Sequence, residues 1–364
     1  MQPDADQLEI TLIGPGQGEC CVAHLGSGQW IIVDSCRNSQ TRHPVALEYF
    51  AHIGTQADLV ILIVATHWHD DHISGLAATL QACGKAKLCC SSALSSREFL
   101  AAVAPYNERL QFAGSSRVSE LFEVLHELDV SRRTSPTRAG PDRRIVRLQP
   151  SSLAHGYPCE IWTLSPSDAQ MEAFYSEIGQ LVPQLRETKA RLPSQKTNLL
   201  SVVTLVQVGP FAALLGADLE ETANPQTGWT PIVRSTARPG AMSQIFKVPH
   251  HGSENGHSPE VWTAMLKPKP ISIATPYSGG RNAIPSEQDK ARISQLSSDF
   301  YVTAPTQPGR PRKLPNAVEK TIAEHGIKLR PVEPCTGLIR LRNGGGLNPN
   351  AWSVELAGNA YLVR

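Results

Sequence analysis

The chain of 364 residues lacks several features that would place it in a simple class. Its eight cysteines include no Cys-x-x-Cys pair, so neither a zinc ribbon nor a small disulfide framework is indicated. No apolar run approaches the roughly 20 residues that cross a bilayer, and residues 1–6 do not resemble a signal peptide. A formal net charge of +1 gives no general attraction to nucleic acid. These absences predict a cytoplasmic protein without membrane attachment, whose thiols are free and mostly buried.

The most informative segment is the run Thr-His-Trp-His-Asp-Asp-His that ends at His72, directly after the apolar stretch 59–64. Burying imidazoles and carboxylates without partners is costly, and a bound metal ion would offset that cost. His67 and His69 are two residues apart, so they face the same side of an extended segment. Asp71 and His72 lie where the chain turns toward a helix and can address a second ion. The run therefore predicts a hydrolase site for two metal ions.

Three other apolar stretches end in groups of the same kind. Residues 30–33 precede Asp34, and residues 212–217 precede Asp218. The segment Lys-Val-Pro-His-His-Gly-Ser then places two histidines, His250 and His251, after a third stretch. With the spacing His-x-His-x-Asp-His, these segments resemble the metallo-β-lactamase superfamily. The last one is similar to the hydrolase domain of the DNA-uptake protein ComEC.

This resemblance covers most of residues 8–305, and it implies the fold. The expected architecture is a four-layer αββα sandwich of the α/β class, with helical insertions and a small C-terminal β extension. Residues 1–305 would form the hydrolase domain, with helical cap insertions at about 92–160 and 167–196. A linker rich in proline and basic residues would follow at 306–336, and the β extension would occupy 337–364.

The resemblance also implies the roles of the site residues. Asp34 would orient a metal-ligating histidine, as such outer partners do. Asp218 would bridge two divalent ions, zinc or manganese, that activate a water molecule. The residues expected to bind the ions are His67, His69, Asp71, His72, Asp218 and His251. Those expected to take part in catalysis are Asp71, Asp218 and His250.

Two positions stay open at this point. Many relatives carry a third histidine for the first ion, where this chain has Asn198, so water, Asn198 or His155 would complete that ion. A site with fewer imidazoles suits manganese as well as zinc. The sequence does not decide which of His250 and His251 is the ligand. We favour His251, with His250 bonding a phosphate oxygen or protonating the leaving group.

The substrate is the least determined property, because this superfamily hydrolyses several bond types. A nuclease or cyclic-nucleotide phosphodiesterase is the first hypothesis. Alternatives are a small phosphoester or phosphocholine-type esterase, a carboxylic ester, lactone or thioester hydrolase, and a metal-bound interaction subunit without activity. A nucleic acid or nucleotide is thus the expected partner, and the sequence identifies no protein partner. The candidate substrate contacts are Lys247, Arg132, Arg133, Arg143 and Arg144, of which the arginines equally suit a solvated loop.

Overall fold

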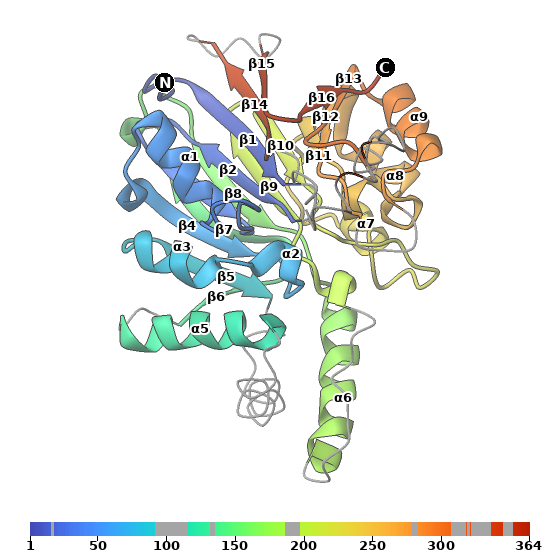
Figure 1. Ribbon diagram of the computed structural model, residues 1–364. Helices are drawn as coiled ribbons and strands as arrows, with labels where there is room; N and C mark the ends of the chain where they lie inside the picture. Colours follow the sequence, from blue (N-terminus) through green and yellow to red (C-terminus); the bar gives the residue numbers. More distant parts are fainter. Residues whose placement is uncertain are drawn as a thin grey trace.

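Two large β-sheets pack face to face in the computed structural model, and helices cover both outer faces (Figure 1). The structure describes residues 1–15, 18–91, 116–131, 135–185, 197–278, 283–306, 336–344 and 352–364, together with 318 and 321. The layers are those of the predicted αββα sandwich of the metallo-β-lactamase fold. None of the helices within these ranges is long and apolar enough to cross a membrane.

Each sheet has eight strands. The first has the spatial order β15 (Trp352–Ala357), β14 (Gly337–Asn343), β1 (Leu8–Gly14), β2 (Cys20–His24), β3 (Trp30–Val33), β4 (Val60–Ala65), β5 (Lys87–Ser91) and β6 (Thr137–Ala139). The second has the order β16 (Tyr361–Leu362), β13 (Asp299–Val302), β12 (Leu266–Ala274), β11 (Ser243–Lys247), β10 (Phe211–Leu215), β9 (Thr204–Val208), β8 (Cys159–Thr163) and β7 (Arg143–Leu148).

The helices divide between the two outer faces. On the first sheet lie α1 (Val45–Ile53), α3 (Leu76–Ala82), α5 (Ser116–Val130) and the start of α6 (Asp168–Leu185). On the second lie α7 (Thr230–Arg234), α8 (Pro259–Ala264) and α9 (Glu287–Leu296). The short helix α2 (Asp70–Ile73) and the 3-10 turns η1 (Ala57–Leu59), η2 (Pro150–Ser152), η3 (Thr197–Leu200), η4 (His250–Gly252) and η5 (Glu254–Gly256) complete the elements.

Apolar residues on both sides of each strand explain the four layers. In β3, Ile31 packs in the core between the sheets, whereas Trp30 and Ile32 pack under the helices. In β10, Leu215 faces the other sheet and Leu214 faces the helices. Successive side chains of a strand point to opposite faces, so a strand that is apolar throughout must be covered on both.

The described residues of the predicted cap insertion 92–160 are only partly helical, and residues 92–115 and 132–134 lie outside the described residues. Helix α5 occupies part of this stretch, but β6, β7 and the first residues of β8 are strands. Strand β7 lies at a sheet edge, and its register shifts between Arg144 and Val146, so the alternation that identifies a strand is interrupted. Helix α6 occupies residues 168–185 of the second predicted stretch and projects from the sandwich in Figure 1, and residues 186–196 lie outside the described residues.

The predicted C-terminal β extension, residues 337–364, consists in its described part of strands that join the main sheets. Strand β14 pairs antiparallel with β1 along its whole length, and β16 pairs with β13. The end of the chain therefore contributes to both sheets of the sandwich. Of the predicted linker, only 306, 318, 321 and 336 are among the described residues.

His24, at the end of β2, is a buried histidine outside the candidate site. Its Nδ1 lies 2.8 Å from the Gln7 carbonyl oxygen, and its Nε2 accepts a hydrogen bond from the Gly28 amide at 3.0 Å. This arrangement requires a neutral ring with its proton on Nδ1. Burial lowers the pKa of His24 to about 4.

Candidate metal centre

The candidate site lies where strands of both sheets end. Strand β3 is parallel to β4, and β10 is parallel to β11, which is parallel to β12. Parallel strands have their carboxyl ends at the same edge, where α/β proteins commonly bind ligands. The loops after β3 and β4 carry Asp34 and the histidine run, and those after β10 and β11 carry Asp218 and His251.

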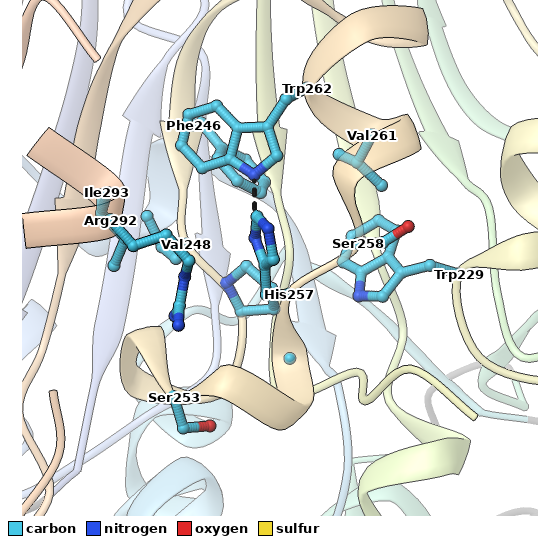
Figure 2. A pocket seen from close by; sticks show the side chains of 12 residues that line it. Trp229, Phe246, Val248, Ser253, His257, Ser258, Val261, Trp262, Arg292 and Ile293 are labelled. Carbon is cyan, nitrogen blue, oxygen red and sulfur yellow. Dashed lines mark hydrogen bonds between the residues drawn. The ribbon is translucent and has the colours of Figure 1, made fainter. Parts of the chain in front are cut away.

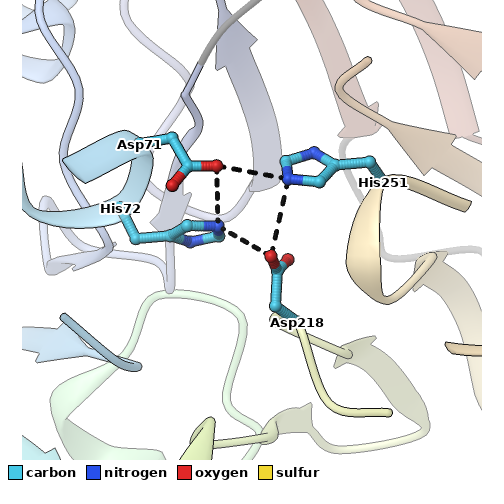
Figure 3. Close-up of side chains that lie close together, drawn as sticks. All are labelled: Asp71, His72, Asp218 and His251. Carbon is cyan, nitrogen blue, oxygen red and sulfur yellow. Dashed lines mark ion pairs between the residues drawn. The ribbon is translucent and has the colours of Figure 1, made fainter. Parts of the chain in front are cut away.

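Four side chains converge between these loops: Asp71, His72, Asp218 and His251 (Figure 3). Asp218 Oδ2 lies 3.3 Å from His72 Nε2 and 3.5 Å from His251 Nε2. Asp71 Oδ2 lies 3.7 Å from His72 Nε2 and 3.3 Å from His251 Nε2. Ligand atoms about 2.0–2.1 Å from a tetrahedral zinc ion are roughly 3.4 Å apart. The spacing of the four atoms therefore fits one ion among them.

The outer hydrogen bonds of the two histidines support this fit. His72 Nδ1 lies 2.7 Å from Asp34 Oδ2, so this nitrogen carries the proton. His251 Nδ1 lies 3.1 Å from the Thr275 carbonyl oxygen, which imposes the same tautomer. Both rings then direct the lone pair of Nε2 at carboxylate oxygens, an arrangement that is unfavourable without a cation. His72 Nε2 is buried and makes no hydrogen bond within the described ranges.

Asp34 organises a second histidine through Thr66. The Thr66 hydroxyl donates to Asp34 Oδ2 at 2.7 Å and lies 3.0 Å from His67 Nδ1. The hydroxyl proton is used on Asp34, so His67 Nδ1 must be the donor in the second bond. His67 Nε2 is thereby left as a lone pair. One carboxylate thus sets the tautomers of two candidate ligands, where the sequence predicted one.

A second group of candidate metal ligands consists of His67, His69 and Asp218. It shares Asp218 with the first group, which is Asp71, His72, Asp218 and His251. His67 Nε2 lies 3.9 Å from Asp218 Oδ2 and 3.1 Å from His69 Nδ1. His69 Nε2 is hydrogen-bonded to the Thr197 hydroxyl. Two groups with Asp218 in common match the expected arrangement for two ions.

Asn198 lies next to this second group. Its Nδ2 donates to Glu220 Oε1 at 2.7 Å and lies 3.2 Å from His250 Nε2. Its Oδ1 is buried and has no hydrogen-bond partner among the residues described. An oxygen in that state is available to an ion or to a substrate. His155 is not part of either group, since its Nε2 bonds the Leu25 carbonyl oxygen at 2.8 Å.

The electrostatics of the cluster also indicate a demand for positive charge. Burial lowers the pKa of His67 well below its ordinary value. Burial also acts to lower the pKa values of His72 and His251, but the nearby carboxylates of Asp218 and Asp71 outweigh this effect. The pKa of His72 is therefore raised well above its usual value, and that of His251 is raised to about 10. Protons thus occupy these positions when no metal does, and metal ions would displace them.

The loops that hold the site have unusual backbone conformations. Asp34, Ala217, His250 and His251 all have positive φ, at 62°, 47°, 47° and 55°. Residues with a Cβ adopt this region at a cost of roughly 1–2 kcal/mol each, and such residues cluster at functional sites. This conformational cost occurs in three of the loops that meet at the site, which supports a functional rather than a purely structural role for these loops.

His250 lies at the rim of the cluster, and His251 lies inside it. The His250 side chain is 18% exposed, and its Nδ1 lies 2.9 Å from Asn255 Oδ1. A cavity of about 10 Å³ behind this loop is walled by Phe246 and Trp262 (Figure 2). Arg292, which also lines the cavity, donates to the Gly252 carbonyl oxygen at 2.9 Å. The cavity has room for one water molecule at most, so it supports the loop and is too small for a substrate.

Lys247 does not occupy the surface position predicted for a substrate contact. It is buried at 2% exposure, and its ammonium group donates to the Ala217 carbonyl oxygen at 2.8 Å and forms an ion pair with Glu19. Glu19, the residue directly before β2, was not identified from the sequence as part of the site. Glu19 Oε1 lies 3.7 Å from His72 Nδ1, so this pair lies directly behind the cluster.

Of the four arginines predicted to contact the substrate, the structure describes two. Arg132 and Arg133 lie outside the described residues. Arg143 and Arg144 belong to β7 rather than to a loop, and Arg144 pairs with Glu160 at 2.8 Å. Arg143 is opposite Thr163 of β8, which is opposite Thr204 of β9. This register places Arg143 at the same end of the sheet as the site.

Comparisons with known proteins give fold-level similarity. No protein-family model matches the chain, and no curated protein matches it. Among solved structures, it is similar to the metallo-β-lactamase fold protein YhfI from Bacillus subtilis, at 12% identity over 82% of this chain and 95% of that one, with a TM-score of 0.40. It is also similar to the metallo-β-lactamase SMB-1, at 13% identity over 69% and 80% of the two chains, with a TM-score of 0.34. Because these identities and TM-scores are low, the fold is assigned from the strand order and layers of this chain itself. The chemistry of the site is inferred from the cluster of candidate metal ligands.

Proposed function

We propose that this protein is a metal-dependent hydrolase that cleaves phosphodiester bonds with two divalent ions, zinc or manganese. The observation that carries the proposal is the pair of donor groups that share Asp218. The imidazoles of His72, His67 and His251 are held by Asp34, Thr66 and Thr275, respectively, with lone pairs directed inward. A site that served only folding would have no use for several buried lone pairs aimed at carboxylates.

The roles of the residues follow from their positions. Two ions bound at this site would supply Lewis acidity and a nucleophile at neutral pH. Asp71, His72 and His251 would hold one of them, His67 and His69 the other, and Asp218 both. His250 at the rim would hydrogen-bond a phosphate oxygen or protonate the leaving group.

The substrate class has weaker support than the metal chemistry. The segment 247–253 resembles the ComEC hydrolase domain, and Arg143 lies at the site end of its sheet. Both features suit a nucleic acid or nucleotide. The seven cysteines of the described part are free and buried, which suits a reducing compartment, and we place the activity in the cytoplasm.

The test is hydrolysis by the purified chain loaded with manganese or zinc. The substrates are single-stranded DNA, duplex DNA, RNA, cyclic nucleotides and a chromogenic phosphodiester, with a lactone and a thioester as the competing class. We expect turnover of at least one phosphodiester, and a loss of 100-fold or more in Asp218→Ala or His69→Ala, both still folded because the apolar core does not include them. The matched control is Asp58→Ala, since Asp58 is an exposed partner of Lys85. Activity within a few-fold in Asp218→Ala at verified metal content would refute the mechanism. Turnover of only the lactone or thioester would refute the substrate class.

A further inference from the structure

Lys247 is a buried cation that the roles above leave unexplained. Lysine is almost never fully buried unless it is paired, and moving an ammonium group out of water costs several kcal/mol. Strand β11 is otherwise apolar at this end, with Ile245 and Phe246 packed in the core on its two faces. A methionine or leucine would fill the same volume without that cost, so the charge itself requires an explanation.

Glu19 ties Lys247 to the first sheet and to the supports of the cluster. Its backbone amide donates to the Asp71 carbonyl oxygen at 2.9 Å, and its Oε2 accepts from the Thr275 hydroxyl at 2.7 Å. The carbonyl oxygen of the same Thr275 faces His251 Nδ1. Through Glu19, the ammonium group of Lys247 is therefore connected to the peptide of one candidate ligand and to the residue that orients another.

On its other side, Lys247 holds the turn that presents Asp218. Its Nζ donates to the carbonyl oxygen of Ala217, whose φ of 47° is unfavourable for a residue with a Cβ. Nζ also lies 3.8 Å from Asp218 Oδ1, which is buried and makes no hydrogen bond within the described chain. The other oxygen of Asp218, Oδ2, is the atom that faces the histidines. One oxygen thus faces the cation behind the site, and the other faces the metal positions.

We propose that Lys247, held in place by Glu19, is a positioning residue that fixes the Ala217–Asp218 turn so that Asp218 Oδ2 addresses both metal ions. This inference rests on the proposed function, because it assumes that Asp218 is the shared ligand. Lys247 touches neither substrate nor reacting atoms in this role. Its effect passes through the orientation of one carboxylate.

The decisive variant is the double substitution Glu19→Gln, Lys247→Met. It leaves the net charge unchanged, so it separates positioning from the simple attraction between a cation and nearby charges. The measurement is affinity for zinc and for manganese by competition with a chelator, together with thermal unfolding in the absence of metal. We expect the double variant to unfold at a higher temperature than Lys247→Met alone, because Glu19 is no longer a buried carboxylate that has lost its cation. We expect its metal affinity to stay 10–100-fold below that of the wild type.

The matched control is Glu9→Gln, Arg342→Met, which removes a second ion pair between β1 and β14, with a separation of 2.7 Å, in which Glu9 is buried and Arg342 is partly buried. This control should bind metal as the wild type does. Affinity within twofold of wild type in the Glu19→Gln, Lys247→Met protein would overturn the positioning role. If that protein does not fold, Glu19→Gln alone takes its place, and unchanged affinity there would overturn the role equally.

The failures of the two proposals are distinguishable. A wild-type chain that binds two ions and cleaves a phosphodiester, beside a double variant of normal affinity, would refute only the role of Lys247. A wild-type chain that binds no divalent ion would refute the proposed function, and the role of Lys247 with it. In active variants, a fall in kcat at constant KM is expected, since Lys247 does not contact the substrate.

Discussion

Replacing Asp34 with asparagine should weaken metal binding without unfolding the protein. Asp34 has a φ of 62°, a conformation that asparagine adopts more readily than most residues, and the two side chains have nearly the same shape. Its carboxylate accepts three hydrogen bonds: from the Thr66 amide at 2.8 Å, from the Thr66 hydroxyl at 2.7 Å and from His72 Nδ1 at 2.7 Å. An amide has one oxygen to offer, so it cannot accept all three in the same geometry.

Both orientations of the new amide are unfavourable. If its NH₂ group faces the Thr66 backbone amide, two donors oppose each other, and leaving a buried donor unpaired costs about 1–3 kcal/mol. If the NH₂ group faces His72 instead, Nδ1 of that ring must become an acceptor. The ring proton then moves to Nε2, which faces Asp218 at 3.3 Å, and blocks the position of the ion.

The expected loss is 10–100-fold in metal affinity, which corresponds to about 1.4–2.7 kcal/mol. Chelator competition with zinc and with manganese measures it, and far-ultraviolet circular dichroism checks the fold. Asp58→Asn is the matched control, because Asp58 is 53% exposed and forms a surface ion pair with Lys85 at 3.5 Å. A folded Asp34→Asn protein that binds both ions within twofold of the wild type would refute the tautomer argument.

Three further predictions test other parts of the structure. Asn198→Ala should lower metal affinity by less than His67→Ala does, by about tenfold or less, in a metal-content assay; equal losses would make Asn198 a full ligand. His24 binds a proton more weakly in the folded state (pKa about 4) than in the unfolded state (6.5), so it stabilises the fold above pH 6.5 and loses this contribution as pH falls toward 4. The free energy of unfolding should therefore fall by about 2–3 kcal/mol more in the wild type than in His24→Gln between pH 7 and pH 4.5, and parallel pH profiles would contradict this. Arg143→Gln should weaken cleavage of long nucleic acid and reduce its salt dependence by about one charge, but spare a small phosphodiester; Arg147→Gln, at the other end of β7, is the control, and equal behaviour of the two variants would exclude a substrate role for Arg143.

The sequence predicted the parts of the site that are local in the chain. The histidine run follows one buried strand, so the spacing of His67, His69, Asp71 and His72 already contains four of the six candidate metal ligands. The two-sheet fold followed from the resemblance and from apolar stretches that end in carboxylates. The choice of His251 over His250 agrees with the position of each ring in the structure, although the metal-binding roles themselves stay predictions.

The errors have physical causes in non-local contacts. The position of Lys247 was not predictable because β11 is buried on both faces, and such a strand has no alternation to show which way its last side chain points. Glu19 shows no role in the sequence alone, because its partners are Lys247 at the end of β11 and Thr275 after β12, which come together with the start of β2 only in the folded protein. The pairing of β14 with β1 joins opposite ends of the chain, and no local pattern specifies it.

The division of the cluster between the two sheets explains why these failures occur together. The first sheet contributes His67, His69, Asp71 and His72, and the second contributes Asp218 and His251. Short stretches of sequence specify the ligands that each sheet contributes, but the distance between the two sets of ligands depends on how the sheets pack. Thr66 and Val202 bond across that boundary at 3.1 Å, and the Glu19–Lys247 pair crosses it behind the cluster. The candidate metal ligands can therefore be predicted from local sequence spacing. The residues that align the ligands of the two sheets can be identified only from the folded structure.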